Sequence, residues 1–154
     1  MKHLHPGQPT RQITISIVDW RKHSESLSRI RREVFIEEQG VPREMEWDDL
    51  DLTAIHFLAT DKNGLPVATA RLQNNGKVGR MAVLKAWRQR GVGTAMMRQV
   101  IETAGQQQQP LYLHAQLSAE SFYRQFGFQR VGEPFDEAGI PHVHMRQLWK
   151  EPAS

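Results

Sequence analysis

Two glycines near the middle of the chain separate an apolar run from an amphipathic stretch. The apolar run covers Val78 to Leu84, the sequence Arg-Gln-Arg-Gly-Val-Gly occupies positions 88–93, and the amphipathic stretch covers Thr94 to Ala104. A short apolar run next to turn residues is typical of a buried strand, and apolar residues spaced four apart are typical of a helix. The sequence therefore predicts a strand, a glycine turn and a helix in direct succession.

This succession is the layout of an anion-binding site. Glycines let the backbone approach a ligand closely, and the free N–H groups and positive dipole end of the following helix attract phosphate. We therefore expect a phosphorylated cofactor at the turn. A glycine turn that binds nothing stays open as the alternative.

Two common phosphate motifs do not fit this segment. A Walker A loop needs lysine and then serine or threonine directly after its last glycine, and neither Gly91 nor Gly93 is followed in that way. A dinucleotide fingerprint needs a third glycine or alanine near position 96, where this chain has Met96. What remains is Arg-x-x-Gly-x-Gly after a strand.

A second segment, from Gln116 to Phe128, reads as a short helix between two strands. Ser118 is a natural N-cap, and Phe122 and Phe126 lie one turn apart, so they can share a buried face. Gly127 suits the left-handed position just after a helix. The segment is preceded by an apolar strand from Leu111 to Ala115.

Taken in this order, the two segments resemble the GNAT superfamily of acetyl-coenzyme A dependent N-acyltransferases, over about Ile13 to Leu148. Arg-Glu-Val-Phe-Ile-Glu-Glu-Gln at 32–39 and Gly-Ile-Pro-His at 139–142 resemble the small bacterial ElaA-like branch. The resemblance implies an N-acetyltransferase that moves an acetyl group from acetyl-coenzyme A directly to a primary amine of a small molecule or peptide, in a ternary complex.

Length and composition are compatible with a compact enzyme. The 154 residues suffice for one domain, which we expect over residues 12–150 after a mobile start at 1–11. There is no apolar run of the roughly 20 residues that span a membrane, and no secretory start, so we expect a cytoplasmic protein without a membrane partner. The chain has no cysteine, which excludes a cysteinyl acyl-enzyme and favours direct transfer.

The net charge of +3 is mild and does not imply nucleic-acid binding. We expect the basic cluster of Arg29, Arg31 and Arg32 to be a solvated helix face. An exposed sheet edge could support a homodimer.

Periodicity predicts the remaining elements. Ile13, Ile15 and Ile17 indicate a half-buried first strand, and the stripe Leu27, Ile30, Val34 indicates a helix over about 24–39. Further strands are expected at 55–60, 66–72 and 143–148, with a hairpin turn at 61–64 and a helix that Gly105 ends. These elements predict an α/β fold with a mixed, mainly antiparallel central sheet flanked by helices.

The resemblance also implies roles for cofactor-site residues. Backbone groups of Met81, Ala82 and Val83 would bind the pantetheine arm, and the Val83 N–H would face the reacting carbonyl oxygen. The pyrophosphate would lie on the amides of Arg88, Gln89, Arg90, Gly91, Val92, Gly93 and Thr94, with Arg88 adding charge. Gln116 stands where the superfamily often has asparagine, so its pantetheine contact departs from the pattern.

Tyr123 is the expected general acid. A phenol with an ordinary pKa of about 10 is neutral at physiological pH and can give its proton to a departing thiolate. The alternative is a tyrosine that only anchors the short helix in the core.

The acidic segment from Glu44 to Asp51 is expected to be a loop on the substrate side, suited to a cationic amine. The expected acceptor-binding residues are Glu37, Trp47, Asp49, His114 and His142. The general base stays open among Glu37, Glu38, Glu46, Asp48, Asp49, Asp51, His56 and His114. His142 and His144 could form a metal pair, but no third ligand is evident, so no metal is expected.

Two other classes of function stay open. A non-catalytic acetyl-coenzyme A sensor on the same fold would bind the cofactor and release no thiol with any amine. A plain interaction domain would bind no cofactor at all.

Overall fold

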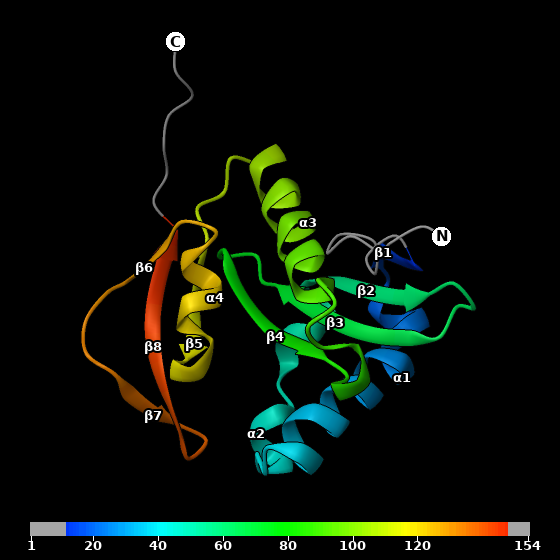
Figure 1. Ribbon diagram of the computed structural model, residues 1–154, viewed down its shortest axis with the longest axis horizontal. Helices are drawn as coiled ribbons and strands as arrows, with labels where there is room; N and C mark the ends of the chain where they lie inside the picture. Colours follow the sequence, from blue (N-terminus) through cyan, green and yellow to red (C-terminus); the bar gives the residue numbers. More distant parts are fainter. Residues whose placement is uncertain (1–11, 148–154) are drawn as a thin grey trace, which may run out of the picture.

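In the computed structural model of the protein, residues 12–147 are described. The expected mobile start at 1–11 and the expected domain end at 148–150 lie outside them. Helices and strands follow one another in mixed order along the chain (Figure 1). In chain order they are β1 (Ile13–Val18), α1 (Trp20–Arg31), a π-helical segment (Arg32–Glu38), α2 (Arg43–Glu46), a 3-10 turn (Asp49–Leu52), β2 (Ile55–Asp61), β3 (Pro66–Leu72), β4 (Lys77–Val83), a 3-10 turn (Lys85–Trp87), α3 (Val92–Gln106), β5 (Tyr112–Gln116), a 3-10 turn (Leu117–Ala119), α4 (Glu120–Arg124), β6 (Phe128–Arg130), β7 (Phe135–Glu137) and β8 (Ile140–Gln147).

All eight strands of the described chain form one sheet. Its order is β1-β2-β3-β4-β5-β8-β6, and β7 pairs with β8 beside this path. The pairing is antiparallel everywhere except between β4 and β5, which run parallel. The predicted fold class is therefore confirmed.

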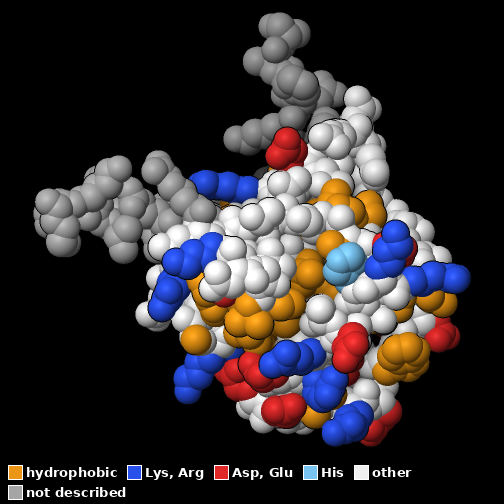
Figure 2. All heavy atoms as spheres, turned by 90° about the vertical axis from the view of Figure 1, so that its right-hand side faces the viewer, with side chains coloured by type: hydrophobic (Ala, Val, Ile, Leu, Met, Phe, Trp, Pro, Cys, Tyr) orange, Lys and Arg blue, Asp and Glu red, His pale blue; other side chains and the backbone are white. Residues whose placement is uncertain are grey.

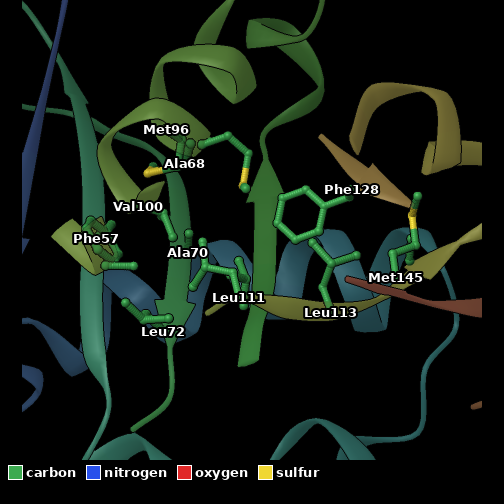
Figure 3. Packing of buried hydrophobic residues seen from close by; sticks show 14 of the residues in the cluster. Phe57, Ala68, Ala70, Leu72, Met96, Val100, Leu111, Leu113, Phe128 and Met145 are labelled. Carbon is green, nitrogen blue, oxygen red and sulfur yellow. The ribbon is translucent and has the colours of Figure 1, made fainter. Parts of the chain in front are cut away.

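Apolar side chains cover both faces of the sheet. Phe57 on β2 packs into the larger cluster, which contains Met96 and Val100 of α3, whereas its neighbour Leu58 packs with Leu27 and Ile30 of α1. Successive strand residues point to opposite faces, so α3 and α1 lie on opposite sides. Figure 3 shows how side chains from β2, β3, α3, β5, β6 and β8 point toward one another in the larger cluster.

The fourth strand contains a bulge. Gly79 pairs with Arg71 and Ala82 pairs with Thr69, so two residues of β4, Arg80 and Met81, stand opposite a single residue of β3. Arg80 has a φ of 49°, in the left-handed region that side chains other than glycine rarely adopt. A bulge of this kind bends its strand and increases the local twist.

Because of this bend, β4 and β5 separate. Their parallel pairing is limited to Lys77 with Tyr112 and Val78 with Leu113. Beyond Val78, β4 keeps its partner β3 but has no strand on its other edge within the described part of the chain. The sheet is thus split toward the ends of these two strands.

A buried network of arginines and carboxylates lies under the α1 side of the sheet. Arg31 of α1 and Arg71 of β3 are 1% and 2% exposed, and both bind the carboxylate of Asp51, which is 2% exposed. The Arg31 Nη1–Asp51 Oδ1 and Arg71 Nη1–Asp51 Oδ1 distances are 2.9 and 3.0 Å. Asp51 therefore joins the helix to the sheet through two charge-assisted contacts.

The network continues to the bulge. Arg71 also binds both carboxylate oxygens of Asp48, at 2.8 and 3.0 Å, and Arg80 reaches Asp48 Oδ2 at 3.1 Å. Arg80 further donates to the main-chain oxygen of Glu46, whose carboxylate binds Arg31. The left-handed Arg80 is thus held by side chains of the 43–52 segment, as a strained conformation requires.

The network corrects one prediction and explains another difference. Arg31 does not lie on a solvated face, because it follows the buried Leu27 by one helical turn and its charge is matched by Glu46 and Asp51. The segment expected as a loop contains α2 and a 3-10 turn, and it places these carboxylates under the sheet.

Several element ends also differ from the predictions. The first helix begins at Trp20, capped by the Asp19 carboxylate, and its last part widens into the π-helical segment. Ile17 is 55% exposed, so the alternation in β1 stops before it. Gly105 lies inside α3, and Gln108 takes the left-handed position after the helix, with φ 52°.

Around α4, one prediction is wrong and one is confirmed. Ser118 is not the N-cap, because a 3-10 turn carries the chain to Ala119, which precedes α4 without a side-chain cap. Gly127 is left-handed, with φ 87°, as predicted. Phe122 and Phe126 lie edge to face with ring centres 5.2 Å apart and pack on the main core.

Charges of both signs mix on the surface. On the face shown in Figure 2, lysine and arginine side chains lie among aspartates and glutamates and surround a hydrophobic area. Between residues 12 and 147, no helix has the length and apolar character needed to cross a bilayer.

The network predicts a large effect of removing its central charge. Asp51→Asn should lower the free energy of unfolding by about 3 to 5 kcal/mol, because Arg31 and Arg71 stay buried without their shared counter-charge. Asp49→Asn is the matched control, since Asp49 is exposed and should change stability by less than about 0.5 kcal/mol. Urea denaturation measures both, and similar values for the two variants would contradict the role of the network.

Candidate functional site

A cavity of about 1010 Å³ lies where β4 and β5 separate. Its lining divides into two sides, because neighbouring strand residues point to opposite faces of the sheet. We call them the glycine-turn side (Met81, Val83, Gln89, Gly91 to Thr94, Phe122 and Tyr123) and the histidine side (Lys77, Arg80, His114, Glu137 and His142). The first lies with α3 and α4, and the second lies on the opposite face.

The glycine turn presents main-chain donors to the cavity. Gly91 has φ 82° and directly precedes α3, and Gln89 is left-handed as well, with φ 62°. The first hydrogen bond of the helix runs from the Ala95 N–H to the Gly91 oxygen. The N–H groups of Val92, Gly93 and Thr94 precede it, so they need partners from outside the helix, and a phosphate oxygen is a suitable one.

The free edge of β4 adds a second set of main-chain groups. The Leu84 N–H bonds to the Val67 oxygen on β3, so the groups of Val83 point the other way, toward the cavity edge. The Val83 oxygen accepts a hydrogen bond from Arg88 Nε at 2.9 Å. Met81, Ala82 and Val83 all line the cavity, as expected from the sequence.

The two arginines of the turn have protein partners. Arg88 lines the cavity, and its guanidinium forms a two-pronged pair with Glu38, with Nη–Oε distances of 2.6 and 2.7 Å. This pair lowers the pKa of Glu38 and raises that of Arg88. Arg90 lies over the Trp87 ring, 5.1 Å from its centre, and is not part of the cavity lining.

Tyr123 lies between α4 and β4. Its hydroxyl is 4.0 Å from the Met81 sulfur, and the ring packs on Phe122 and Phe128. Burial raises the pKa of the phenol to about 12. The group therefore keeps its proton well above physiological pH, so it is available as a hydrogen-bond and proton donor to a group that gains negative charge beside it.

On the histidine side, Glu137 lies between two imidazoles. Its Oε1 is 3.2 Å from His114 Nδ1, and its Oε2 is 3.7 Å from His142 Nε2. His142 Nδ1 is 2.7 Å from the Ile140 oxygen, which can only accept, so Nδ1 carries the proton. The ring nitrogens that make no hydrogen bond within the described chain are thus Nε2 of His142 and Nε2 of His114, and both rings line the cavity.

Glu137 was not predicted from the sequence, because its place in the site depends on the register of the β7–β8 hairpin. Ala138 and Gly139 both have positive φ and form the two-residue turn that joins β7 to β8. Such a turn fixes the register, so Glu137 pairs with Ile140 and Phe135 with His142. Paired residues of neighbouring strands lie on the same face of a sheet, so Glu137 shares a face with Ile140. His142 is two residues beyond Ile140 and therefore lies on this face as well.

Side chains of the π-helical segment, of α2 and of the residues between them line the cavity on the α1 side of the sheet. Phe35, Val41 and Met45 give an apolar wall. Gln116 also lines the cavity, and its Nε2 donates to Gln39 Oε1 at 2.9 Å across the gap between β5 and this segment. Wide π-helical turns are frequent at functional sites.

Not every predicted substrate residue reaches the cavity. His114 and His142 line it, whereas Glu37, Trp47 and Asp49 do not, and Trp47 is 62% exposed to solvent.

Some of the candidates for a general base line the cavity, and others do not. Glu46 and Asp48 line the cavity but are paired with arginines, and Glu37, Glu38, Asp49, Asp51 and His56 lie outside its lining. His114 is the one base candidate that lines the cavity and is not bound to an arginine.

The described part of the chain holds no group of three or more histidines and carboxylates that could bind a metal ion. His142 and His144 lie on one strand face, and His142 Nε2 is 3.7 Å from Glu137 Oε2.

Comparison with known proteins identifies close relatives. Residues 22–148 match the family model described as acetyltransferase (GNAT) domain. Protein ElaA of Escherichia coli is 34% identical over 84% of this chain and 95% of its own length. The crystal structure of Escherichia coli ElaA aligns with a TM-score of 0.80, and that of an acyl-CoA N-acyltransferase from Pseudomonas aeruginosa with 0.79. Each of these two structures is 31% identical and covers 88% of this chain and 99% of its own.

The raised pKa of Tyr123 predicts its titration. The chain has two tyrosines, so in a Tyr112→Phe variant Tyr123 is the only phenol. At pH 10, where an ordinary tyrosine is half ionised, we expect about one per cent phenolate while the protein stays folded. Ultraviolet absorbance measures the phenolate, and circular dichroism checks the fold. A midpoint near pH 10 in the folded protein would contradict the burial of this hydroxyl.

The same shift predicts how stability depends on pH. The pKa is higher in the folded chain than in the unfolded chain, so the phenol has no effect below pH 10. As the pH rises from 10 toward 12, the unfolded state loses this proton first, and the free energy of unfolding should fall.

Proposed function

The chain belongs to the acetyltransferase (GNAT) family, and from this membership we propose that it moves an acetyl group from acetyl-coenzyme A directly to a primary amine of a small molecule or peptide. Both substrates would be held together in the cavity between β4 and β5. Direct transfer is supported by the composition, since the chain has no cysteine that could carry the acyl group.

One observation carries the proposal. The separation of β4 from β5 leaves a strand edge free next to a glycine turn and the start of α3, all in one cavity. A strand edge can bind the amide groups of a pantetheine arm, and a helix start with unpaired N–H groups can bind its pyrophosphate. The residues present therefore fit coenzyme A, with Met81 to Val83 on the arm and Gly91 to Thr94 on the phosphates.

Bound acetyl-coenzyme A supplies an activated acyl group, since a thioester reacts readily with amines. The chain has to orient the amine, stabilise the developing oxyanion and protonate the leaving sulfur. The Val83 N–H, which points toward the cavity edge, suits the oxyanion. Tyr123 suits the sulfur, since its neutral hydroxyl borders the cavity on the same side as Met81.

The balance of bonds and protons is simple. The amine nitrogen bonds to the acyl carbon, the carbon–sulfur bond breaks, and the thiolate takes a proton from Tyr123. The incoming ammonium has to lose a proton before it attacks, and a second proton leaves the nitrogen as the amide forms. One of these two protons replaces, by way of solvent, the proton that Tyr123 gave, and the other is released. The proton acceptors available on the histidine side are Nε2 of His142 and Nε2 of His114.

Acetyl-coenzyme A binding tests the cofactor part of the proposal. Calorimetric titration of the purified protein should give micromolar affinity that depends on the pyrophosphate. Gly93→Leu should weaken this affinity about tenfold or more, because the new side chain starts in contact with Phe122 and enters the space beside the helix start. Gly105→Leu is the matched control, since it changes the same helix at an exposed position with no neighbouring atoms.

Equal affinities of the two glycine variants would contradict the phosphate assignment. A folded protein that binds acetyl-coenzyme A but releases no thiol with any amine would be a sensor and not an enzyme. A folded protein that does not bind it at all would be an interaction domain.

The role of Tyr123 gives a kinetic prediction. Tyr123→Phe should lower kcat by about tenfold to a hundredfold, because the hydroxyl acts on the leaving sulfur in the transition state. The dissociation constant of acetyl-coenzyme A should change by less than about threefold, because the hydroxyl is expected to act in the transition state and not in the bound ground state. Thiol release and calorimetry measure the two quantities. Parallel losses of turnover and affinity would instead indicate that Tyr123 acts through packing.

A further inference from the structure

Lys77 is a cation of the cavity that forms no ion pair with a carboxylate of the described chain, although the charge of Glu137 on the same side of the cavity acts on it. It begins β4, pairs with Tyr112 and is half-buried. Among the described residues no carboxylate lies within ion-pair distance of its ammonium group, in contrast to Arg31, Arg71 and Arg80. Burial lowers the pKa of Lys77, and a bound anion would relieve this cost.

Arg80 adds unused hydrogen-bond donors to the same side. Its two hydrogen bonds within the described chain both come from Nη2, one to Glu46 and one to Asp48. The buried Nε is 3.5 Å from Glu46 Oε1, whereas Nη1 makes no hydrogen bond within the described chain. Arg80 also lines the cavity, so part of its guanidinium fork is free to bind a ligand there.

The carboxylates of this region are already neutralised. Glu46 and Asp48 line the cavity, but they bind Arg31, Arg71 and Arg80. The acidic segment therefore offers little free negative charge to a cationic substrate, contrary to the sequence-based expectation. Glu137 is shared between His114 and His142.

From these contacts we infer that the acceptor is an amine that also carries a carboxylate. Its carboxylate lies against Lys77 and Arg80, and its amino group lies near His142, where β5 and β4 have separated. Lys77 pairs with Tyr112 of β5, and His142 pairs with Gln116 of the same strand. Tyr112 and Gln116 are four residues apart, so the backbones of Lys77 and His142 are separated by about 13 Å along the strand direction. The lysine side chain bridges part of this length, so several bonds separate the amine from the carboxylate. This inference rests on the proposed acyl transfer and specifies its substrate.

Three amines of equal length test the inference by thiol release from acetyl-coenzyme A. They are ε-aminocaproate, aminohexanol and diaminohexane, which end in a carboxylate, a neutral hydroxyl and a second cation. We expect kcat/KM for ε-aminocaproate to exceed that for the other two by about tenfold or more, as a charge-assisted contact allows. Lys77→Met should lower kcat/KM for ε-aminocaproate about tenfold more than kcat/KM for aminohexanol, and so remove most of this advantage. Lys62→Met, at an exposed turn, is the control and should keep the advantage.

Product binding gives a readout without turnover. N-acetyl-ε-aminocaproate should bind the protein in the presence of coenzyme A more tightly than N-acetylhexylamine, and Lys77→Met should abolish the difference. Turnover of all three amines with no carboxylate preference, or a uniform loss in Lys77→Met, overturns the inference and leaves the proposed function standing. Absence of thiol release with every amine overturns the proposed function and the inference with it.

Discussion

The cavity depends on a buried balance of charge. Arg31, Arg71 and Arg80 face Glu46, Asp48 and Asp51, so each positive charge has a negative one. Burying any of these ions alone would be costly, and the set is tolerable because every charge has a partner. The 43–52 segment therefore stays under the sheet, and its carboxylates hold Arg80 in the left-handed conformation at the bulge. The bulge in turn bends β4 away from β5 and opens the site.

The glycine-turn side of the cavity offers mainly main-chain groups to a ligand, whereas the histidine side offers side chains. The glycine-turn side uses main-chain N–H groups of β4 and α3, whose positions follow from the fold and from the absence of a side chain at Gly91 and Gly93. The histidine side uses side chains of β4, β5 and the β7–β8 hairpin. A main-chain site would suit the proposed acyl donor, which is always the same, and a side-chain site would suit the proposed amine, which can differ.

Local signals were sufficient to predict the glycine turn, the core stripe of α3 and the pairing of Phe122 with Phe126, because the residues that decide these features are neighbours in the sequence. The burial of Arg31 was missed because its partners lie 15 and 20 residues away. The one sequence signal for this burial was that Arg31 follows the buried Leu27 by four residues, which places both on the same helix face. Glu137 was missed because its position depends on a strand register that only the folded hairpin fixes.

The short contact between β4 and β5 has an evolutionary consequence. Only two residue pairs join these strands, so the β7–β8 hairpin and the glycine turn belong to parts of the sheet that share few backbone bonds. Substitutions in the hairpin can then accumulate without disturbing the surface proposed to hold the acyl donor. Lineages that inherit this sheet can vary the Glu137 and His142 end of the proposed amine site by altering one hairpin, while the surface proposed for the acyl donor is inherited intact.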